Sequence, residues 1–409
     1  MKRIWQTTQC RFIVKTWFSA DFFTSSENHR FIKSLRLKPF RHDDTIFAFD
    51  ALRESCRCVS TTTPTTTAPK NASPSNTNAA SKPTSAMQHR MSTLNAGIKY
   101  KPIPPLTAAN LAKAYKDLAK AKLAALVVLT SMCGYAMAPA ATDLSCLFAT
   151  TVGTSLCVAS ANAINQWIEF PYDAQMSRTR NRVLVRRALT PFHGFTFGTI
   201  TGIAGVGILT SFVNPLTAFL GAANIVLYTC IYTPMKRVAI VNTWLGSIVG
   251  AIPPMMGWTA CTNSLDAGAW TLGALLYAWQ FPHFNSLAWN LREDYSKAGY
   301  RMMAVTDPVL NARVSLRHSL ALFPICYLAP YIGMTTWSFA LDSTVINSIL
   351  FLRAFKFWYD SNDRTARDLF FGSLIHLPII LALMMFHKNN TETEYWIEVE
   401  EDENDKGEE

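Results

Sequence analysis

The chain has 409 residues, of which 49% are hydrophobic and only 16% are charged, and its formal net charge is +10 at pH 7. The charged residues lie in short stretches between apolar runs of about 18 to 22 residues, the length that crosses a bilayer. A large soluble helical enzyme would instead carry charges along the outer face of each helix. The composition therefore predicts an all-α, polytopic membrane protein and, because the basic residues lie between apolar runs, no nucleic-acid partner.

Three segments flank or precede the expected membrane domain, which we place at residues 95–388. Residues 1–45 are basic, rich in hydroxyl groups and poor in acids, which is typical of a mitochondrial transit peptide; a basic disordered arm is the alternative. Residues 46–94 include a long run of Thr, Ser, Pro, Ala and Asn that buries little apolar surface, so we expect a disordered linker. Residues 389–409 form an acidic C-terminal tail.

The apolar runs predict nine transmembrane helices. They cover residues 123–139, 144–167, 193–212, 215–233, 240–260, 267–288, 318–338, 341–357 and 369–387. Lys and Arg occupy every second connection, which places all the basic loops on one side of the membrane. For a mitochondrial protein this pattern predicts the inner membrane, with the basic loops and the active site facing the matrix. An odd number of spans then puts the acidic tail in the intermembrane space.

Polar side chains gather at the end of the second predicted span. Asn162, Asn165, Glu169 and Asp173 recur every three or four residues, so they share one face of a helix. The oxygen atoms of Asn165, Glu169 and Asp173 suit Mg²⁺, which commonly bridges carboxylates to phosphate oxygens. Pro171 removes one backbone hydrogen bond, so the last turn can unwind and let Asp173 reach the metal from a loop. The alternative for this pattern is an amphipathic helix end with solvated acids.

Arginine crowds the loop that follows. Forked guanidinium donors match phosphate oxygens, and five of them beside carboxylates favour a Mg²⁺-bound diphosphate, although some serve only to set topology. These residues are Arg178, Arg180, Arg182, Arg186 and Arg187. Lys236 and Arg237, in a later loop, could neutralise a leaving phosphate or simply anchor a helix at the interface.

A third cluster lies in WQFPHFNSLAWNLREDYSKAG, at residues 279–299. A lone histidine in a helical core is usually just hydrogen-bonded. His283, however, has a proline and amides nearby and lies close to the basic side, which makes it a candidate site residue. Asn285, Asn290 and Asp294 are its candidate polar neighbours.

These motifs resemble the UbiA superfamily of intramembrane prenyltransferases, and within it the branch that farnesylates protohaem. Asn165, Glu169 and Asp173 are similar to the family pattern NxxxDxxxD, with Glu in place of one Asp. The segments YTPMKR, WQFPHFNSLAW, EDYSKAGYRMM and ARDLFFGSLIHLP also look like those of this branch, and the similarity covers roughly residues 95 to 388. Val183 and Arg187 depart from the pattern, in which we would expect Pro and Gly.

The resemblance implies a UbiA-like bundle and Mg²⁺-dependent transfer of farnesyl from farnesyl diphosphate to a vinyl group of protohaem (haem B), giving haem O for haem A synthesis in cytochrome c oxidase assembly. Haem would be substrate rather than resident cofactor, and a downstream haem A synthase is a candidate partner. By this resemblance Asn165, Glu169 and Asp173 hold Mg²⁺. The implied catalytic residues are Asn162, Arg178, Arg182, Lys236, Arg237 and His283. The implied substrate-binding residues are Arg186, Asn285, Asn290 and Asp294.

Other functions remain open at this point. A UbiA-type enzyme could act on another aromatic acceptor such as a quinone precursor. His283 stands where other family members have an aspartate-rich motif, which weakens the case for a second Mg²⁺. A transporter could also use acids at membrane depth, although no clear internal repeat supports one.

Overall fold

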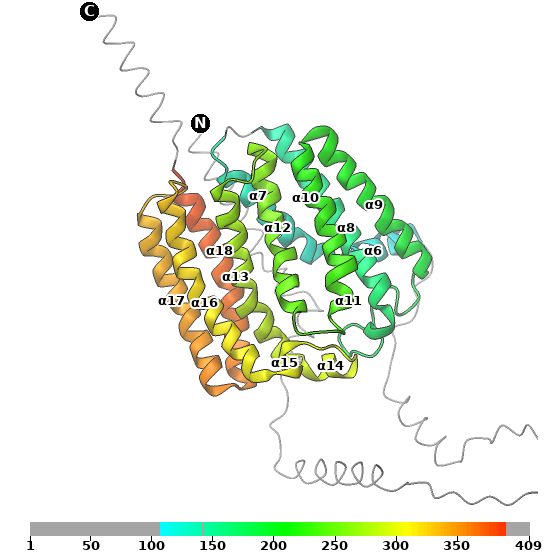
Figure 1. Ribbon diagram of the computed structural model, residues 1–409. Coiled ribbons are helices and arrows are strands. Elements are labelled where there is room, and N and C mark those ends of the chain that lie inside the picture. The colour runs from blue at the N-terminus through cyan, green and yellow to red at the C-terminus, as the bar shows by residue number, and fades with distance from the viewer. Residues whose placement is uncertain (1–106, 141–142, 390–409) are drawn as a thin grey trace, which may run out of the picture. The chain divides into compact units, whose positions relative to one another are not determined.

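The computed structural model describes residues 107–140 and 143–389, and these residues form a bundle of α-helices (Figure 1). The predicted transit peptide, linker and most of the acidic tail lie outside the described residues. The helices of the first half are α6 (Ala108–Leu118), α7 (Ala121–Met137), α8 (Leu144–Asp173), α9 (Pro191–Phe212), α10 (Pro215–Val226), the π-helix η1 (Leu227–Tyr232), α11 (Thr233–Met235) and α12 (Asn242–Thr262). The second half consists of α13 (Ala267–Asn290), α14 (Arg292–Lys297), α15 (Met303–Thr306), α16 (Pro308–Tyr331), α17 (Ser338–Asp360) and α18 (Asp363–Phe386).

The halves meet where α12 packs against α13 and α7 packs against α18. In the first half, α8 lies along α9, and α10 packs against α9 and α12. In the second half, α13 contacts α16 and α18, while α17 covers both of these helices. The elements α7, α12 and α13 therefore lie where the two halves of the bundle meet (Figure 1).

Small residues let the backbones of neighbouring helices approach closely, as is common in membranes. A Cβ atom added at Gly205 of α9 would lie 2.9 Å from the backbone nitrogen of Cys157 on α8. A Cβ atom at Gly134 of α7 would lie 2.0 Å from the carbonyl oxygen of Pro254 on α12. Any larger side chain at either position would force these helices apart.

The membrane character of the bundle is confirmed, whereas the number of spans stays a prediction. In the described part of the chain, five helices are long and apolar enough to cross a bilayer, and the bent pair α6 and α7, at 53° to each other, makes six if it counts as one span. A long helical segment overlaps each of the nine predicted ranges. Three of these helices, α12, α13 and α16, do not meet the same test of length and hydropathy.

Two local expectations were wrong. Pro171 does not unwind the end of α8, because the helix continues to Asp173 and the next amide, Ala174 N, still bonds the carbonyl of Phe170. The predicted range 318–338 also starts too late, since α16 begins at Pro308 behind Asp307, whose side chain accepts a hydrogen bond from Leu310 N. A helix cap, rather than hydropathy, sets that boundary.

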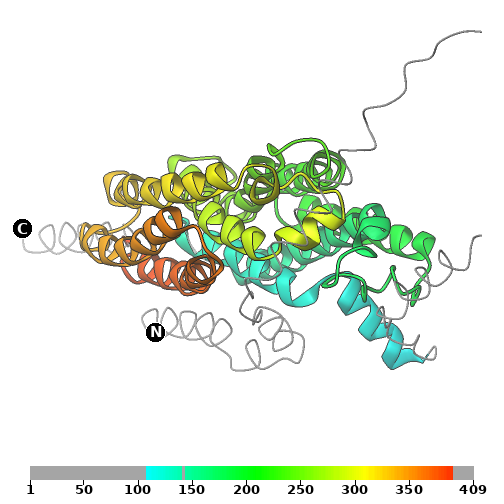
Figure 2. The same cartoon turned by 90° about the horizontal axis from the view of Figure 1, so that it is seen from below.

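The basic connections meet at one end of the bundle. The carbonyl of Lys236, after α11, accepts a hydrogen bond from the Arg301 amide at 2.8 Å. Arg292 of α14 pairs with Asp363 at the start of α18 at 2.8 Å. Figure 2 looks onto this end, past α14 and α15. The predicted grouping of basic loops is therefore present in the fold, while the compartment that they face stays a prediction.

Candidate functional site

The polar face of α8 lies inside the bundle at its basic end. Asn162, Asn165, Glu169 and Asp173 have exposed fractions of 5%, 1%, 4% and 1%. The alternative of a solvated helix end is therefore wrong. Buried carboxylates require partners, and cations from two other segments supply them.

Lys236 and Arg182 pair with the two carboxylates. Lys236 Nζ lies 2.7 Å from Glu169 Oε1. Arg182 Nη1 hydrogen-bonds Asp173 Oδ2 and lies 3.9 Å from Glu169 Oε2. Burial lowers the pKa of Lys236, but the Glu169 carboxylate more than offsets burial, so this pKa lies above its ordinary value.

Lys120 is a member of this cluster that the sequence did not single out. It lies at the break between α6 and α7 with a left-handed φ of 50°, and its Nζ donates to Asn165 Oδ1 at 3.0 Å. Burial, followed by the charge of Arg182, lowers the pKa of Lys120 well below its ordinary value. Asn162 Nδ2 donates to the carbonyl of Ala119 at 3.0 Å and so ties the segment between α6 and α7 to α8. No glycine or proline marks this bend, so hydropathy alone made Lys120 look like an ordinary flanking lysine.

The Asn165 amide is held at both ends. Its Oδ1 accepts from Lys120, and its Nδ2 donates to Thr233 Oγ1 at 2.9 Å. Thr233 closes η1, because both its backbone N–H and its hydroxyl bond the carbonyl of Tyr228. Single π-turns of this kind occur frequently at functional sites.

The residues present fit Mg²⁺ only if a substrate supplies further ligands. Asp173 Oδ1 is buried and has no hydrogen-bond partner, which leaves one carboxylate oxygen for a cation. Across residues 107–140 and 143–389, no group of three or more His, Cys, Asp or Glu side chains could hold a metal ion. Mg²⁺ typically uses one or two carboxylates together with water and substrate phosphates, and this cluster has that composition.

The arginine-rich loop is held against α14. Asp294 Oδ2 accepts from Ser177 Oγ at 2.6 Å and from the Arg178 amide at 3.4 Å, so in this structure it anchors the loop. Arg178 is exposed, and the Nε of Arg186 is buried without a hydrogen-bond partner. Arg187 has a φ of 56°, the left-handed conformation in which a glycine was expected.

Arg237 turns away from the buried cluster. Its Nη1 donates to the hydroxyl of Tyr172 at 2.6 Å, and its guanidinium lies 4.3 Å from the centre of that ring. Its neighbour Lys236 instead lies over the Tyr232 ring at 4.5 Å. Only one of the two cations therefore joins the carboxylates in this structure.

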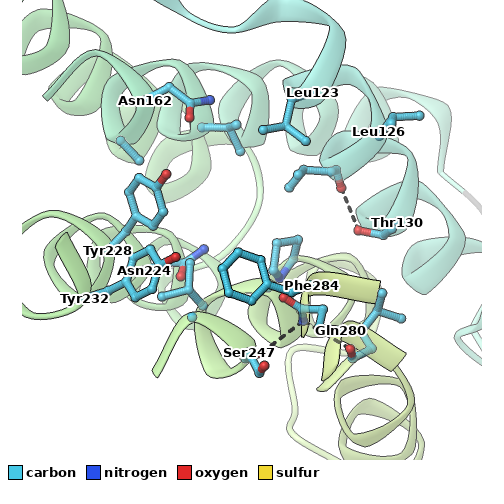
Figure 3. A pocket seen from close by; sticks show the side chains of 18 of the residues that line it. Leu123, Leu126, Thr130, Asn162, Asn224, Tyr228, Tyr232, Ser247, Gln280 and Phe284 are labelled. Carbon is cyan, nitrogen blue, oxygen red and sulfur yellow. Dashed lines mark hydrogen bonds between the residues drawn. The ribbon is translucent and has the colours of Figure 1, made fainter. Parts of the chain in front are cut away.

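The side chains at the end of α8 and the cations around them form one ionic cluster, which consists of Lys120, Asn165, Glu169, Asp173, Arg182 and Lys236. A cavity of about 420 Å³, drawn in Figure 3, begins beside this ionic cluster. Asn162 and Tyr232 line it and connect it to that cluster. Most of its other lining residues are apolar, and the lining comes from α7, α8, α10, η1, α12, α13 and α18. On α8 the lining runs from Asn162 to Thr154, a depth of about 12 Å at 1.5 Å per residue. The space suits a long apolar chain whose charged end stays at the ionic cluster.

His283 lines the same cavity from α13. Its ring stacks with that of Trp279, at a centroid distance of 4.6 Å, and with that of Phe370 of α18, at 5.0 Å. Its Nδ1 lies 2.9 Å from Ser373 Oγ. The sequence thus placed His283 at a site, but the partner on α18 is distant in the chain and carries no motif signal.

The two asparagines near His283 bond backbone carbonyls: Asn285 bonds one on another helix, and Asn290 bonds one on its own helix. Asn285 is fully buried and donates to the carbonyl of Asn311 on α16 at 3.3 Å. Asn290 donates to the carbonyl of Ser286, one turn earlier, at 2.8 Å. Neither lines the cavity, so the structure does not bring them together with His283, and their role in substrate binding stays a prediction.

Comparison with known proteins agrees with this architecture. The chain is 54% identical over 268 residues to the mitochondrial protoheme IX farnesyltransferase of Homo sapiens. The match covers 66% of this chain, and it spans about 60% of the length of the human protein.

Two solved structures share the fold, at identities too low to indicate more than the fold. One, from work on a digeranylgeranylglyceryl phosphate synthase, has a TM-score of 0.57 and 13% identity, and covers 68% of this chain and 98% of its own. The other is a UbiA homolog from Aeropyrum pernix K1, with a TM-score of 0.52 and 15% identity, covering 65% of this chain and 97% of its own. The model of the UbiA prenyltransferase family matches residues 127–375, more than half of the sequence. The chain therefore belongs to the UbiA prenyltransferase family.

Proposed function

We propose that this protein transfers the farnesyl group of farnesyl diphosphate to a vinyl group of protohaem, giving haem O. The observation that carries the proposal is the junction between a buried ionic cluster and an apolar cavity that contains His283. The family membership and the name of the human relative support the same reaction. That name also supports a mitochondrial location, and we assign the basic end of the bundle to the matrix side of the inner membrane.

The cations of the cluster act on the departing diphosphate. The side-chain nitrogens of Lys120, Arg182 and Lys236 lie against the buried polar face of α8, where charge interactions are strong. Bound through Asn165, Glu169 and Asp173 and the diphosphate oxygens, Mg²⁺ would supply further positive charge to the leaving group. These groups lower the barrier by stabilising the negative charge that develops as the allylic C–O bond breaks.

The apolar cavity controls what reacts with the allylic cation. In the overall reaction the C–O bond breaks, and a C–C bond forms between the farnesyl C1 and the vinyl carbon. The resulting porphyrin-side cation adds water and loses a proton, so the products are haem O and diphosphate. The mostly apolar side chains around the farnesyl chain keep water out until that step. Trp279 and His283, whose rings stack on each other, both line this cavity, where we place the acceptor.

A purified and reconstituted full-length protein tests the proposal. With Mg²⁺, farnesyl diphosphate and protohaem, we expect mass spectrometry to detect haem O, and we expect none with Asp173→Asn or with EDTA. A quinone-precursor acceptor provides the matched comparison. Prenylation of that acceptor but not of protohaem would assign the protein to another UbiA-type reaction. Substrate flux across vesicles without diphosphate release would instead indicate a transporter.

A further inference from the structure

Ser373 of α18 holds two aromatic side chains of α13 at once. Its backbone carbonyl accepts a hydrogen bond from Trp279 Nε1 at 3.0 Å. Its hydroxyl oxygen lies 2.9 Å from His283 Nδ1. The residue itself is fully buried. A single serine thus ties together the first and fifth positions of the WQFPHF segment.

The proton count at Ser373 sets the tautomer of His283. A serine hydroxyl has one proton and two lone pairs. The carbonyl of Phe370 lies 2.7 Å from the hydroxyl oxygen and accepts that proton, and with the proton so assigned the oxygen accepts from His283. Nδ1 of the imidazole therefore carries the hydrogen, and Nε2 of the neutral ring carries a lone pair. Within residues 107–140 and 143–389, no protein group hydrogen-bonds this Nε2.

The orientation of the ring is fixed as well as its tautomer. Trp279 stacks on one side with an interplanar angle of 15°, and Phe370 stacks with an angle of 27°. Flipping the ring would break the bond to Ser373, because Nδ1 would move away from the Ser373 hydroxyl oxygen. His283 itself lines the cavity, and this arrangement leaves Nε2 available as a ligand rather than as a hydrogen-bond donor.

We propose that Ser373 is a positioning residue that holds His283 so that Nε2 binds the iron of the metalloporphyrin acceptor as an axial ligand. A neutral imidazole nitrogen is a common iron ligand, and the partner of the other ring nitrogen decides which nitrogen is free. Metal-ligating histidines almost always donate that second N–H to an oxygen, which also raises their basicity. Ser373 provides this oxygen. The inference rests on the proposed function, because it takes haem to be the acceptor.

Absorption and resonance Raman spectroscopy of the full-length protein with ferric haem B tests the proposal. We expect the wild-type protein to give a histidine-ligated haem spectrum, and His283→Ala to lose it. Ser373→Ala should weaken haem affinity by about 10- to 100-fold, the usual effect of removing such a supporting partner. Ser373→Thr, which keeps the hydroxyl group, should restore most of this affinity.

Ser319 offers a matched control. It is a fully buried serine on α16 whose hydroxyl bonds the carbonyl of Leu316 at 2.8 Å, the same intrahelical bond that Ser373 makes. Ser319→Ala should leave the haem spectrum unchanged. If Ser373→Ala and Ser319→Ala behave alike, Ser373 has no positioning role and the proposal fails.

Metal-free protoporphyrin and the transfer assay separate the remaining outcomes. Protoporphyrin should bind with the same affinity to the wild-type protein and to His283→Ala, because it has no iron to ligate. An iron spectrum that does not depend on His283, combined with normal haem O production, would overturn this inference and leave the proposed function intact. Absence of both haem binding and haem O would contradict the proposed function itself.

Discussion

The salt bridge between Lys236 and Glu169 allows the buried ionic cluster to be tested quantitatively. Its atoms lie 2.7 Å apart, and the two side chains are only 11% and 6% exposed. Lys236→Met keeps a long unbranched side chain but leaves the Glu169 charge in the interior. Removing one partner of a buried pair costs about 3–5 kcal/mol. We expect Lys236→Met to lower the free energy of unfolding by about 3 kcal/mol, the low end of that range, because Arg182 remains 3.9 Å from Glu169 Oε2.

The double variant isolates the interaction from the loss of the lysine itself. Lys236→Met combined with Glu169→Gln removes both charges, so no carboxylate is left without this partner. We therefore expect the double variant to be more stable than Lys236→Met alone. The coupling free energy should fall between about 0.5 and 3 kcal/mol, as for residues in direct contact.

The assay is a reversible denaturant titration of the full-length protein in detergent, followed by circular dichroism. Lys297→Met is the control, because Lys297 is an exposed lysine of α14. This control should unfold like the wild-type protein. If Lys236→Met also unfolds like the wild-type protein, or if the effects of the two site substitutions simply add, the interaction between Lys236 and Glu169 does not stabilise the fold.

Three further predictions concern the site. Burial lowers the pKa of Lys120, and binding of an anionic diphosphate should raise that pKa again, so at a pH above the lowered pKa the protein should take up protons on binding. Calorimetry in buffers of different ionisation enthalpy should detect this uptake, and Lys120→Arg should abolish it because arginine stays protonated. Thr233→Val leaves the Asn165 amide without its acceptor, so we expect more Mg²⁺ to be needed for half-maximal activity, whereas Thr233→Ser should behave like the wild-type protein. Gly221→Val adds carbon to the cavity wall, where even a Cβ atom would lie 3.1 Å from Leu209 Cδ1 and 3.2 Å from Met256 Cε. The preference should therefore shift from farnesyl toward geranyl diphosphate in a competition assay.

Each of these predictions has a clear contrary result. Equal proton uptake by Lys120→Arg would remove Lys120 from the diphosphate site. An unchanged Mg²⁺ requirement in Thr233→Val would show that the Asn165 amide keeps its orientation without Thr233. Unaltered use of farnesyl diphosphate by Gly221→Val would place the end of the prenyl chain elsewhere.

Much of the fold could be predicted because hydropathy and charge both vary along this chain with the period of membrane crossings. The polar face of α8 was also predictable, since a spacing of three or four residues puts Asn165, Glu169 and Asp173 on one side of any helix. The depth of that face was not predictable. A helix end with acids looks solvated until Arg182 and Lys236 are seen to fold over it.

The missing parts of the site depend on contacts between distant residues. Lys120 reaches Asn165 only because the chain bends between α6 and α7, and no residue type marks that bend. Ser373 lies 90 positions after His283, and a buried serine in an apolar helix usually bonds only its own backbone. Asp294 could be identified as a polar residue near the site, whereas its place under the arginine loop depends on how α14 packs.

The haem content of cells tests the central claim most directly. In cells that lack this gene, we predict that extracted haem contains protohaem but neither haem O nor haem A, and that the wild-type gene restores both whereas Asp173→Asn does not. Haem A at normal levels in the deleted cells would contradict the assignment of this ionic cluster and cavity to haem farnesylation.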